Sequence, residues 1–358
     1  MMDVRDHISQ INTLARQFMN SQVLFAANEA DVFSHLEKPA TAAEVASKVD
    51  WNPRATRMLL DGLVALGLVA KSGERYQNTA AASACLVPGR PAYQGNIVRH
   101  IRYTAPGWYR IEESLRTGKA ADAEPRERPA EELRAFILGM NDIARTSAKE
   151  ILNILDLSPY RHLLDLGGGP ATYAITFLEA HPRMKAAVFD LPAVIPIARE
   201  QVREAKMEAR ISFIAGDMLT DSYGSGYDLI LLSNIIHSFS AEKNQTIVRK
   251  CSEAIEPGGL FIIKDFLVDN DRTGPAYSLM FALHMLVGTG EGDTYTFSQV
   301  QEWTREAGLE DFRSIDLTPQ TRMWLTRKPF PAARSSLIGF LDKTPPSKLR
   351  HGDFTPDE

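Results

Sequence analysis

A run of glycines and two acidic residues mark the most chemically informative part of the sequence. Asp165 stands two residues before a glycine run that begins at Gly167 and ends at Gly169, and Asp190 follows 21 residues after Gly169. Residues without a Cβ let the backbone turn tightly and approach a ligand closely. Asp165 could accept hydrogen bonds from loop amides or orient an amino group, and Asp190 could accept both hydroxyls of a ribose. A glycine loop alone would also suit a dinucleotide binder or a plain tight turn.

A third acidic residue, Asp217, favours a nucleotide-like ligand. It follows the next apolar run and lies between Gly216 and Met218. Its carboxylate could accept a hydrogen bond from an adenine amino group while Met218 packs on the ring. The three acidic residues end successive predicted strands, and open α/β sheets bind ligands at that edge. Any one of them could instead cap a helix or a turn, but the whole set together with the glycine run indicates a binding site.

The composition of the glycine loop distinguishes between two adenosine-containing ligands, a dinucleotide and S-adenosylmethionine. From Gly167 the loop has the sequence Gly-Gly-Gly-Pro-Ala-Thr, which lacks the third glycine that packs helix against strand in dinucleotide-binding loops. The Gly-Asp-Met segment at 216–218 also has no role in that pattern. S-adenosylmethionine carries no pyrophosphate that needs room, so the sequence predicts this cofactor, with S-adenosylhomocysteine as its product.

The elements that must position these residues are short apolar runs that alternate with helical segments. The predicted strands are 163–166, 186–189, 211–214, 229–233 and 260–265. This alternation predicts an α/β fold with a mostly parallel, doubly wound, Rossmann-like sheet. A helical stretch from Glu131 to Leu155 precedes the first strand. The polar segment from 118 to 129, which contains two prolines, is expected to connect this stretch to the N-terminal part.

The N-terminal part of the chain predicts helices and one small hairpin. Apolar residues recur at helical spacing over 23–36. Residues 41–44 form a capping box that opens a short helix, and Asn52-Pro53 supplies the N-cap and the first-turn proline of another. The segment from 68 to 76 then predicts a strand, a turn and a strand. Helix, turn, helix and hairpin are the outline of a winged helix.

The overall composition is that of a globular protein without an excess of basic charge. The chain has 358 residues, of which 44% are hydrophobic and 24% charged, and its formal net charge is −5. This balance argues against a dedicated binder of nucleic acid or of an anionic membrane. Cys85 and Cys251 lack metal-ligand spacing, so neither a disulfide framework nor a metal site is expected. Because no segment has the apolar core of a signal peptide or the length of a membrane span, we expect a cytoplasmic protein.

Five motifs together resemble the winged-helix class of small-molecule O-methyltransferases, which includes caffeate, flavonoid and acetylserotonin O-methyltransferases and bacterial antibiotic-tailoring enzymes. The resemblance covers about residues 10–328, and its motifs are Asp-Leu-Gly-Gly-Gly from Asp165, Phe-Asp-Leu-Pro from Phe189, Gly-Asp-Met from Gly216, Ile-His-Ser-Phe-Ser-Ala-Glu from Ile236 and Pro-Gly-Gly from Pro257. It implies a homodimer of secondary metabolism that transfers methyl groups to a small aromatic or heteroaromatic acceptor.

The resemblance also implies a division of roles along the chain. Residues 1–110 would form the winged-helix dimerisation domain, and residues 111–155 a helical linker that lines the acceptor pocket. Residues 156–330 would form the S-adenosylmethionine-binding domain, and 331–358 an extended or partly disordered C-terminal tail. The cofactor-binding residues are then Asp165, Gly167, Gly169, Asp190, Leu191, Gly216, Asp217, Met218 and Ser233.

The catalytic base of this family is a histidine just after the fourth strand, and His237 occupies its place. A histidine can take the proton of a hydroxyl as the oxygen attacks the methyl group, although a bare histidine more often has a local structural role. The family's first orienting acid corresponds to Asp265, which would hold the imidazole tautomer. The second, normally a glutamate, falls on Thr294, where Asp293 or Glu291 could substitute. This departure leaves C- or N-methylation, or tailoring without methyl transfer, as alternatives.

The resemblance places the acceptor pocket on two helical segments. The implied residues are Phe136, Met140 and Ile143 on one helical face, with Met285, Thr289 and Trp108. Core packing is the commoner meaning of an apolar face at this spacing. His284 is an alternative contact or base. Because most of these side chains are apolar and no basic cluster accompanies them, a planar aromatic acceptor is favoured.

A winged-helix regulator that senses S-adenosylmethionine is the alternative from another functional class. Such a domain can place its second helix in the major groove of DNA. Only Arg54 and Arg57 are basic around the presumed recognition helix, and two basic residues are few for contacts to the phosphates of DNA. We therefore expect no nucleic-acid partner and no membrane partner.

Overall fold

The computed structural model describes residues 3–121, 129–330 and 349–350. The chain divides into two compact units, Met1–Tyr103 and Thr104–Glu358. The boundary falls inside helix α5 (Gly95–Tyr109), which ends just before the boundary predicted at residue 110. Apart from the two-residue strand β11 (Leu349–Arg350), the predicted tail lies outside the described residues. Residues 122–128 of the predicted connector also lie outside them.

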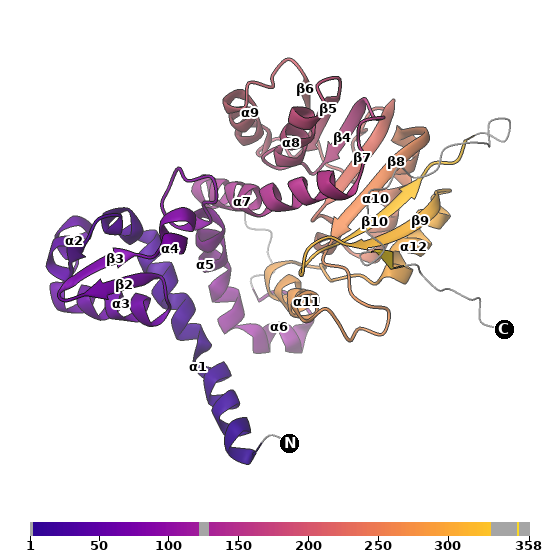
Figure 1. The fold of residues 1–358 in the computed structure, drawn as a ribbon. Coiled ribbons are helices and arrows are strands. Elements are labelled where there is room, and N and C mark those ends of the chain that lie inside the picture. Colours follow the sequence, from indigo (N-terminus) through magenta and orange to yellow (C-terminus); the bar gives the residue numbers. More distant parts are fainter. Residues whose placement is uncertain (1–2, 122–128, 331–348, 351–358) are drawn as a thin grey trace. The chain divides into compact units, whose positions relative to one another are not determined.

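The N-terminal unit has the predicted winged-helix elements (Figure 1). Its helices are α1 (Val4–Glu29), the 3-10 helix η1 (Val32–Leu36), α2 (Ala42–Val49), α3 (Pro53–Ala65) and α4 (Ala80–Cys85). Its antiparallel sheet has the order β1-β3-β2, from β1 (Ala40–Thr41), β2 (Val69–Ser72) and β3 (Arg75–Asn78). The predicted hairpin is therefore confirmed as β2 and β3.

Local side-chain chemistry explains where these helices begin. The Thr41 hydroxyl accepts the amide of Glu44, whose carboxylate accepts the Thr41 amide in return, so the capping box is confirmed. Asn52 Oδ1 accepts the amide of Ala55 at 3.1 Å, as expected for an N-cap. The single helical pattern predicted over 23–36 is broken, because Asp31 adopts a left-handed conformation at φ 51°. This turn redirects the chain into η1, whose apolar side chains are fully buried.

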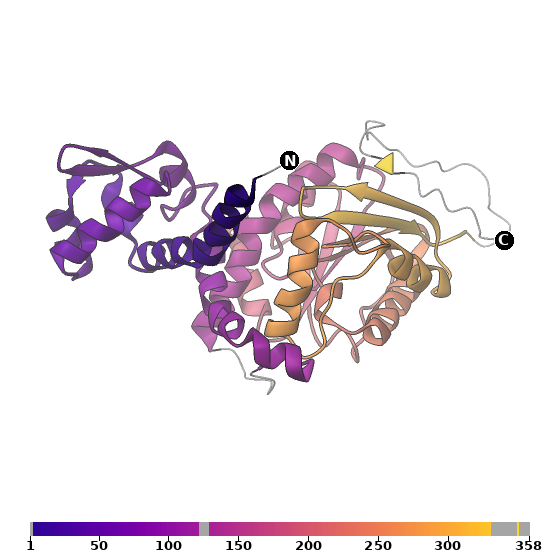
Figure 2. The same cartoon turned by 90° about the horizontal axis from the view of Figure 1, so that it is seen from below.

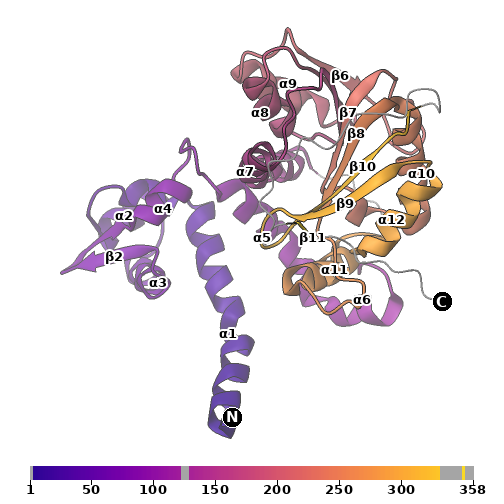
Figure 3. The same cartoon turned by 45° about the vertical axis from the view of Figure 1, so that its right-hand side comes forward.

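Helix α1 carries an exposed apolar stripe along its N-terminal part. Figure 3 shows this part of the helix extending beyond α2, α3 and α4 of its own unit. The exposed large apolar side chains are Val4, Ile8, Ile11, Leu14, Phe18 and Met19, each more than half exposed. Their spacing places them on one face of the helix.

The C-terminal unit contains the predicted doubly wound sheet. Its strands are β4 (His162–Leu166), β5 (Lys185–Asp190), β6 (Ile211–Ala215), β7 (Tyr227–Ser233), β8 (Ile255–Asp265), β9 (Glu310–Asp316) and β10 (Arg322–Arg327). Their order is β11-β9-β10-β8-β7-β4-β5-β6. The five predicted strands, β4 to β8, are confirmed and run parallel. Strands β9 and β10, which we did not predict, extend this sheet: β10 pairs antiparallel with β8, and β9 pairs antiparallel with β10.

Helices cover both faces of this sheet, as the doubly wound prediction requires (Figure 2). The described helices of this unit that follow α5 are α6 (Ile111–Thr117), α7 (Ala130–Ile154), α8 (Thr172–Ala180), α9 (Ile195–Glu204), η2 (Ile236–Ser238), α10 (Ala241–Ala254), α11 (Ala276–Gly288) and α12 (Phe297–Glu306). Leu163 packs in the cluster with α7, α8 and α9, whereas Leu164 packs in the cluster with α10 and α12. Alternation along each strand therefore separates two cores, and the parallel strands carry Asp165, Asp190 and Ser233 to one edge.

The described part of the chain was expected to contain neither a membrane span nor a metal site. None of its helices is long and apolar enough to cross a lipid bilayer. No cluster of three or more His, Cys, Asp or Glu side chains in the same residues is arranged to hold a metal ion.

Candidate active site

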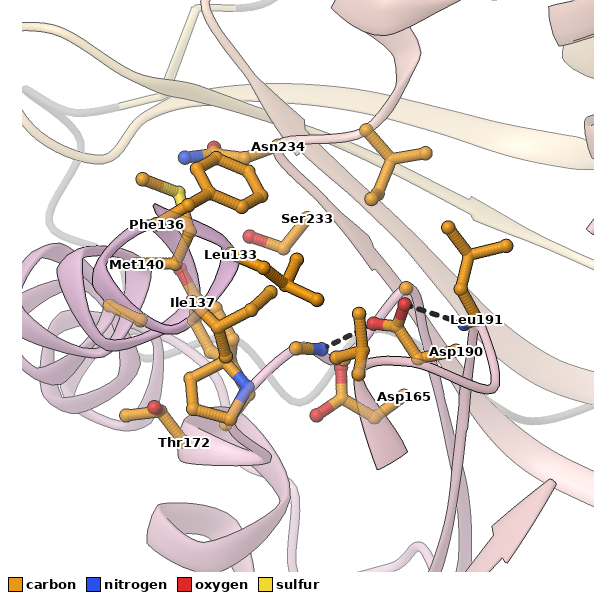
Figure 4. A pocket seen from close by; sticks show the side chains of 18 of the residues that line it. Leu133, Phe136, Ile137, Met140, Asp165, Thr172, Asp190, Leu191, Ser233 and Asn234 are labelled. Carbon is orange, nitrogen blue, oxygen red and sulfur yellow. Dashed lines mark hydrogen bonds between the residues drawn. The ribbon is translucent and has the colours of Figure 1, made fainter. Parts of the chain in front are cut away.

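A cavity of about 610 Å³ lies where β4, β5 and β7 end, with α7 along one side. Figure 4 shows its wall of apolar side chains from α7 opposite the carboxylates of the strand ends. The lining residues are Leu133, Phe136, Ile137, Met140, Ala144, Asp165, Gly167, Gly168, Gly169, Pro170, Thr172, Tyr173, Asp190, Leu191, Ala193, Val194, Ser233, Asn234 and Ile235. Most of the predicted cofactor residues are thus brought together in one cavity.

The glycine loop between β4 and α8 leaves no room for a side chain at Gly167 or Gly168. Gly167 and Gly169 have φ angles of 68° and 53°, a region that glycine adopts without strain. A Cβ on Gly168 would lie 2.9 Å from Asp165 Cγ and from Val188 Cγ1. The Gly167 amide also donates to the carbonyl of Phe189 at 2.8 Å, which ties the loop to β5. The loop is therefore a bare backbone surface facing the cavity.

Asp165 is buried at the end of β4. Its Oδ2 accepts the amide of Ala174 in α8 at 3.2 Å, a helix amide and not one of the loop amides that we considered. Burial raises the pKa of Asp165 to about 7, although the bond from Ala174 opposes the shift and the nearby Asp190 adds to it. The carboxyl group therefore changes charge near neutral pH.

We expect the stability of the unliganded protein to fall between about pH 4 and pH 7 because of Asp165. Its pKa is higher in the folded than in the unfolded chain, so the folded state binds the extra proton and loses that stabilisation as the pH rises. Asp165→Asn should therefore raise the melting temperature relative to the wild type more at pH 8 than at pH 5. Thermal unfolding at both pH values checks this, with the exposed Asp217→Asn as control. Equal differences at the two pH values would contradict the assignment.

Asp190 is held by two backbone amides at the end of β5. Gly169 donates to Oδ2 and Leu191 donates to Oδ1, each at 2.7 Å (Figure 4). Burial raises the pKa of Asp190, while the two amides lower it. Each oxygen keeps a second lone pair, so this fixed carboxylate can still accept two hydroxyl groups from the cavity.

The Gly-Asp-Met segment after β6 lies beside the cavity and not in its wall. Gly216, Asp217 and Met218 are absent from the lining, and Asp217 is exposed. Asp217 Oδ1 accepts the amide of Leu219 at 2.8 Å, so this carboxylate organises its own turn. Met218 Cε lies close to Gly167, which places the segment next to the glycine loop.

Ser233 ends β7 and faces the cavity. Its hydroxyl is buried and has no hydrogen-bond partner among the described residues. A buried polar atom without a partner costs free energy, so such atoms often mark the place of a ligand or water.

His237 and Asp265 form a buried pair beside these strands. His237 lies in η2, and its Nδ1 is 2.7 Å from Oδ1 of Asp265 at the end of β8. Burial raises the pKa of Asp265, but a positive charge on His237, its hydrogen bond, the Phe266 amide and Lys264 together hold this pKa below its usual range. The carboxylate can only accept a hydrogen bond, so in the neutral ring Nδ1 of His237 carries the proton. Nε2 of this neutral ring has the lone pair that a general base needs, and the carboxylate stabilises the imidazolium that forms when it takes a proton.

The predicted second acid is missing from the histidine pair. Thr294 is buried, and its hydroxyl has no partner in the described part of the chain. The two candidate substitutes are engaged elsewhere: Glu291 pairs with Lys243 at 2.5 Å, and Asp293 lies 3.6 Å from Arg272. Asp265 is therefore the carboxylate that orients the His237 ring.

Helix α7 supplies the apolar wall of the cavity. Of the residues predicted to line the acceptor pocket, Phe136 and Met140 lie in this wall and Ile143 does not. Ile143 lies seven residues after Phe136, on the same face of the helix, but it is not among the residues that line this cavity. Sequence reasoning did not identify three further residues of this wall, Leu133, Ile137 and Ala144.

The remaining predicted acceptor residues lie outside the lining of this cavity. Met285 is buried in α11, and the Thr289 hydroxyl donates to its carbonyl at 2.7 Å, which helps to end the helix. The Trp108 indole donates from Nε1 to Nδ1 of His284 at 3.1 Å. The Phe281 ring lies 5.0 Å from the His237 ring and 5.4 Å from the His284 ring. Aromatic side chains thus connect His237 to His284.

Comparisons with known proteins agree with this geometry. A family model described as the O-methyltransferase domain matches residues 118–310, and one described as the O-methyltransferase dimerisation domain matches residues 12–88. A 3-hydroxy-5-methyl-1-naphthoate 3-O-methyltransferase of Streptomyces sahachiroi is 35% identical over 85% of this chain and 90% of its own length. An N,N-dimethyltransferase of Streptomyces rimosus is 30% identical over 84% of this chain and 89% of its own.

A solved structure extends the likeness to three dimensions. Human N-acetylserotonin methyltransferase in complex with SAM superposes with a TM-score of 0.84 and 28% sequence identity. The match covers 92% of this chain and 99% of the human one.

Proposed function

The chain belongs to the O-methyltransferase family, and from this premise we propose that it transfers the methyl group of S-adenosylmethionine to a hydroxyl of a small aromatic or heteroaromatic compound. The observation that carries the proposal is the cavity that joins the glycine loop, the fixed Asp190 carboxylate and the apolar wall of α7. It has room for an adenosyl group and places an apolar surface beside it.

The residues present fit this cofactor. Gly169 lines the cavity, and a Cβ on it would meet nothing within 4 Å, so this end of the loop presents open backbone to a ligand, and Ser233 offers an unpartnered hydroxyl. Asp190 would hold the ribose, and Asp165 the methionine end. Leu191 lies in the wall beside Asp190. Gly216, Asp217 and Met218 remain proposed contacts to the adenine, since they lie next to the loop but outside the lining.

His237 is the proposed general base and Asp265 its orienting carboxylate. When bound, S-adenosylmethionine supplies an electrophilic methyl group on its sulfonium. Asp265 fixes the imidazole so that Nε2 can receive the proton of the acceptor hydroxyl as the oxygen becomes a nucleophile. The apolar wall excludes water and aligns the acceptor, and alignment contributes the larger part of such a rate.

Phe136 and Met140 are the proposed acceptor contacts in the cavity, with Met285, Thr289 and Trp108 as more distant candidates. An apolar wall of this kind suits a planar ring. Methyl transfer to nitrogen is a second candidate, because Thr294 replaces the expected acid and one similar protein is named an N,N-dimethyltransferase.

Product analysis tests the proposed function. The purified protein is incubated with S-adenosylmethionine carrying a labelled methyl group and a panel of phenols, naphthols and aromatic amines. We expect labelled O-methyl ethers, seen by mass spectrometry as a gain of one methyl per product. Labelled N-methyl products alone would favour the second candidate, and S-adenosylhomocysteine formed without a methylated product would contradict both.

We propose that the chain acts as a homodimer, and a charge on α1 is expected to separate the subunits. Ile11 and Phe18 lie in the exposed apolar stripe, Phe18 inside the dimerisation match and Ile11 one residue before it, so a second copy would cover them. The double variant Ile11→Asp/Phe18→Asp should sediment at the 39.8 kDa of one chain, and the wild type at twice that mass. Ser9→Asp, on the opposite face of α1, is the control. A dimeric double variant would exclude this stripe from the interface.

A further inference from the structure

Lys264 is a fully buried lysine that the proposed reaction does not use. It lies one residue before Asp265 in β8, and its side chain has no exposed surface. Strand alternation places it with Ile262 on the face of the sheet that α7 covers. Burying an ammonium group is costly unless it is well paired. Lys264 donates a hydrogen bond to Asn234 Oδ1 at 2.8 Å, and its charge also helps to lower the pKa of the neighbouring Asp265. The hydrogen-bond partner of the Lys264 ammonium is therefore an amide in the cavity wall.

Lys264 holds Asn234 at two points. The Lys264 carbonyl accepts the Asn234 amide at 2.8 Å, and its ammonium donates to the Asn234 side-chain oxygen. Asn234 itself has a left-handed φ of 56°, directly after Ser233. Lys264 can only donate, so it fixes the Asn234 oxygen toward itself and the side-chain nitrogen away from itself. The amide therefore cannot exchange its two ends without losing this bond.

The free nitrogen of Asn234 faces the acceptor wall. Asn234 lines the cavity, and Figure 4 shows its nitrogen on the side of Phe136 and Met140. An amide whose oxygen accepts from a cation is polarised, which makes its N–H groups stronger donors. The wall contributed by α7 is otherwise apolar at Leu133, Phe136 and Met140, so a polar group of the acceptor has a donor here.

Resting on the proposed function, we propose that Asn234, positioned by Lys264, selects aromatic acceptors that carry a carbonyl or carboxylate oxygen besides the hydroxyl to be methylated. The Asn234 N–H groups donate to that oxygen and thereby set which hydroxyl reaches His237, three residues along the chain. Lys264 is a positioning residue, because its contact to the acceptor runs through Asn234. The buried positive charge also favours an anionic oxygen over a neutral one.

Binding of two matched probes to the protein saturated with S-adenosylhomocysteine tests this proposal. 3-Hydroxy-1-naphthoate carries the carboxylate and 2-naphthol is the same molecule without it. Asn234→Asp keeps the size of the side chain and a partner for Lys264, but it removes both N–H donors. Lys264→Met keeps the apolar stem and frees the amide. Lys185→Met, an exposed lysine on β5, is the control.

We expect the wild type to bind the naphthoate at least about tenfold more tightly than the naphthol. A difference of this size corresponds to the loss of one hydrogen bond to a charged group. Asn234→Asp should abolish this preference and leave naphthol affinity within about twofold. Lys264→Met should reduce the preference about three- to tenfold, and Lys185→Met should keep it. If either residue had only a structural role, its replacement would weaken the binding of both probes equally. The ratio of the two affinities would then stay unchanged, so this ratio distinguishes the two roles.

Three results would overturn the proposal: a wild type without preference between the probes, including one that binds neither; an Asn234→Asp variant that keeps the preference; or equal weakening of both probes. Failure of the proposed function has a different signature, because the wild type would then not bind S-adenosylhomocysteine in the saturation step. In the Lys185→Met control the affinity for S-adenosylhomocysteine should stay within about twofold of the wild type.

Discussion

Replacing His237 by alanine is expected to lower kcat by about a thousandfold, because a positioned general base contributes roughly 10²- to 10⁴-fold. The ring is buried against Asp265 and aromatic side chains, so its Nε2 cannot be replaced by bulk water at low cost. Steady-state kinetics on the acceptor identified by the product panel measure the effect. The residual rate reflects alignment of acceptor and methyl group, which the variant leaves in place.

Two companion measurements make the His237 result specific. S-adenosylhomocysteine affinity of His237→Ala should equal that of the wild type within about twofold, since His237 does not line the cavity. The kcat of Asp265→Asn should lie between those of the wild type and His237→Ala, because an asparagine could hold the ring in place but would not supply the negative charge. A His237→Ala variant with wild-type turnover would remove this residue as the base. The N-methylation candidate would then gain support, because a neutral amine needs no such base.

Replacing Asp190 by alanine is expected to weaken S-adenosylhomocysteine binding by at least about a hundredfold. Hydrogen bonds to a charged group are worth about 1.5–3 kcal/mol each, and a carboxylate holding a ribose makes two. The variant also frees the amides of Gly169 and Leu191, which loosens the glycine loop. Titration calorimetry measures the dissociation constant. We expect the value for Asp190→Asn to lie between those of the wild type and Asp190→Ala.

The matched control for Asp190→Ala is Glu208→Ala, because Glu208 is an exposed acidic residue. This variant should bind S-adenosylhomocysteine as tightly as the wild type does. Circular dichroism distinguishes a loosened loop from an unfolded sheet. Binding of Asp190→Ala within threefold of the wild type would contradict the placement of the ribose at this carboxylate.

Much of the fold followed from the sequence because its signals are local. Helix starts at Thr41 and Asn52 depend on side chains within one turn, and both caps are present. The parallel strands are buried on both faces, so they appear as short continuous apolar runs. Strands β9 and β10 gave no such signal: Glu310–Asp316 mixes charged and apolar residues, and β10 joins the sheet through long-range pairing with β8.

The cofactor edge of the candidate site was more predictable than the acceptor edge. Asp165, Asp190 and the glycines are adjacent to strand ends, and strand ends of a parallel sheet meet at one edge. Ile143 shares the helix face of Phe136 but does not line the cavity, because periodicity identifies a face of a helix and not how far along it the cavity extends. Asn234 and Lys264 could not be paired from the sequence, since they lie 30 positions apart and meet only through β7–β8 pairing.

The most direct test of the central claim is titration of the purified wild-type chain with S-adenosylmethionine and with S-adenosylhomocysteine by calorimetry. We predict saturable binding of both ligands with one site per chain, lost in parallel in Asp190→Ala. Absence of binding heat for either ligand at several temperatures, with a folded protein by circular dichroism, would contradict the claim that this cavity holds an adenosyl sulfonium.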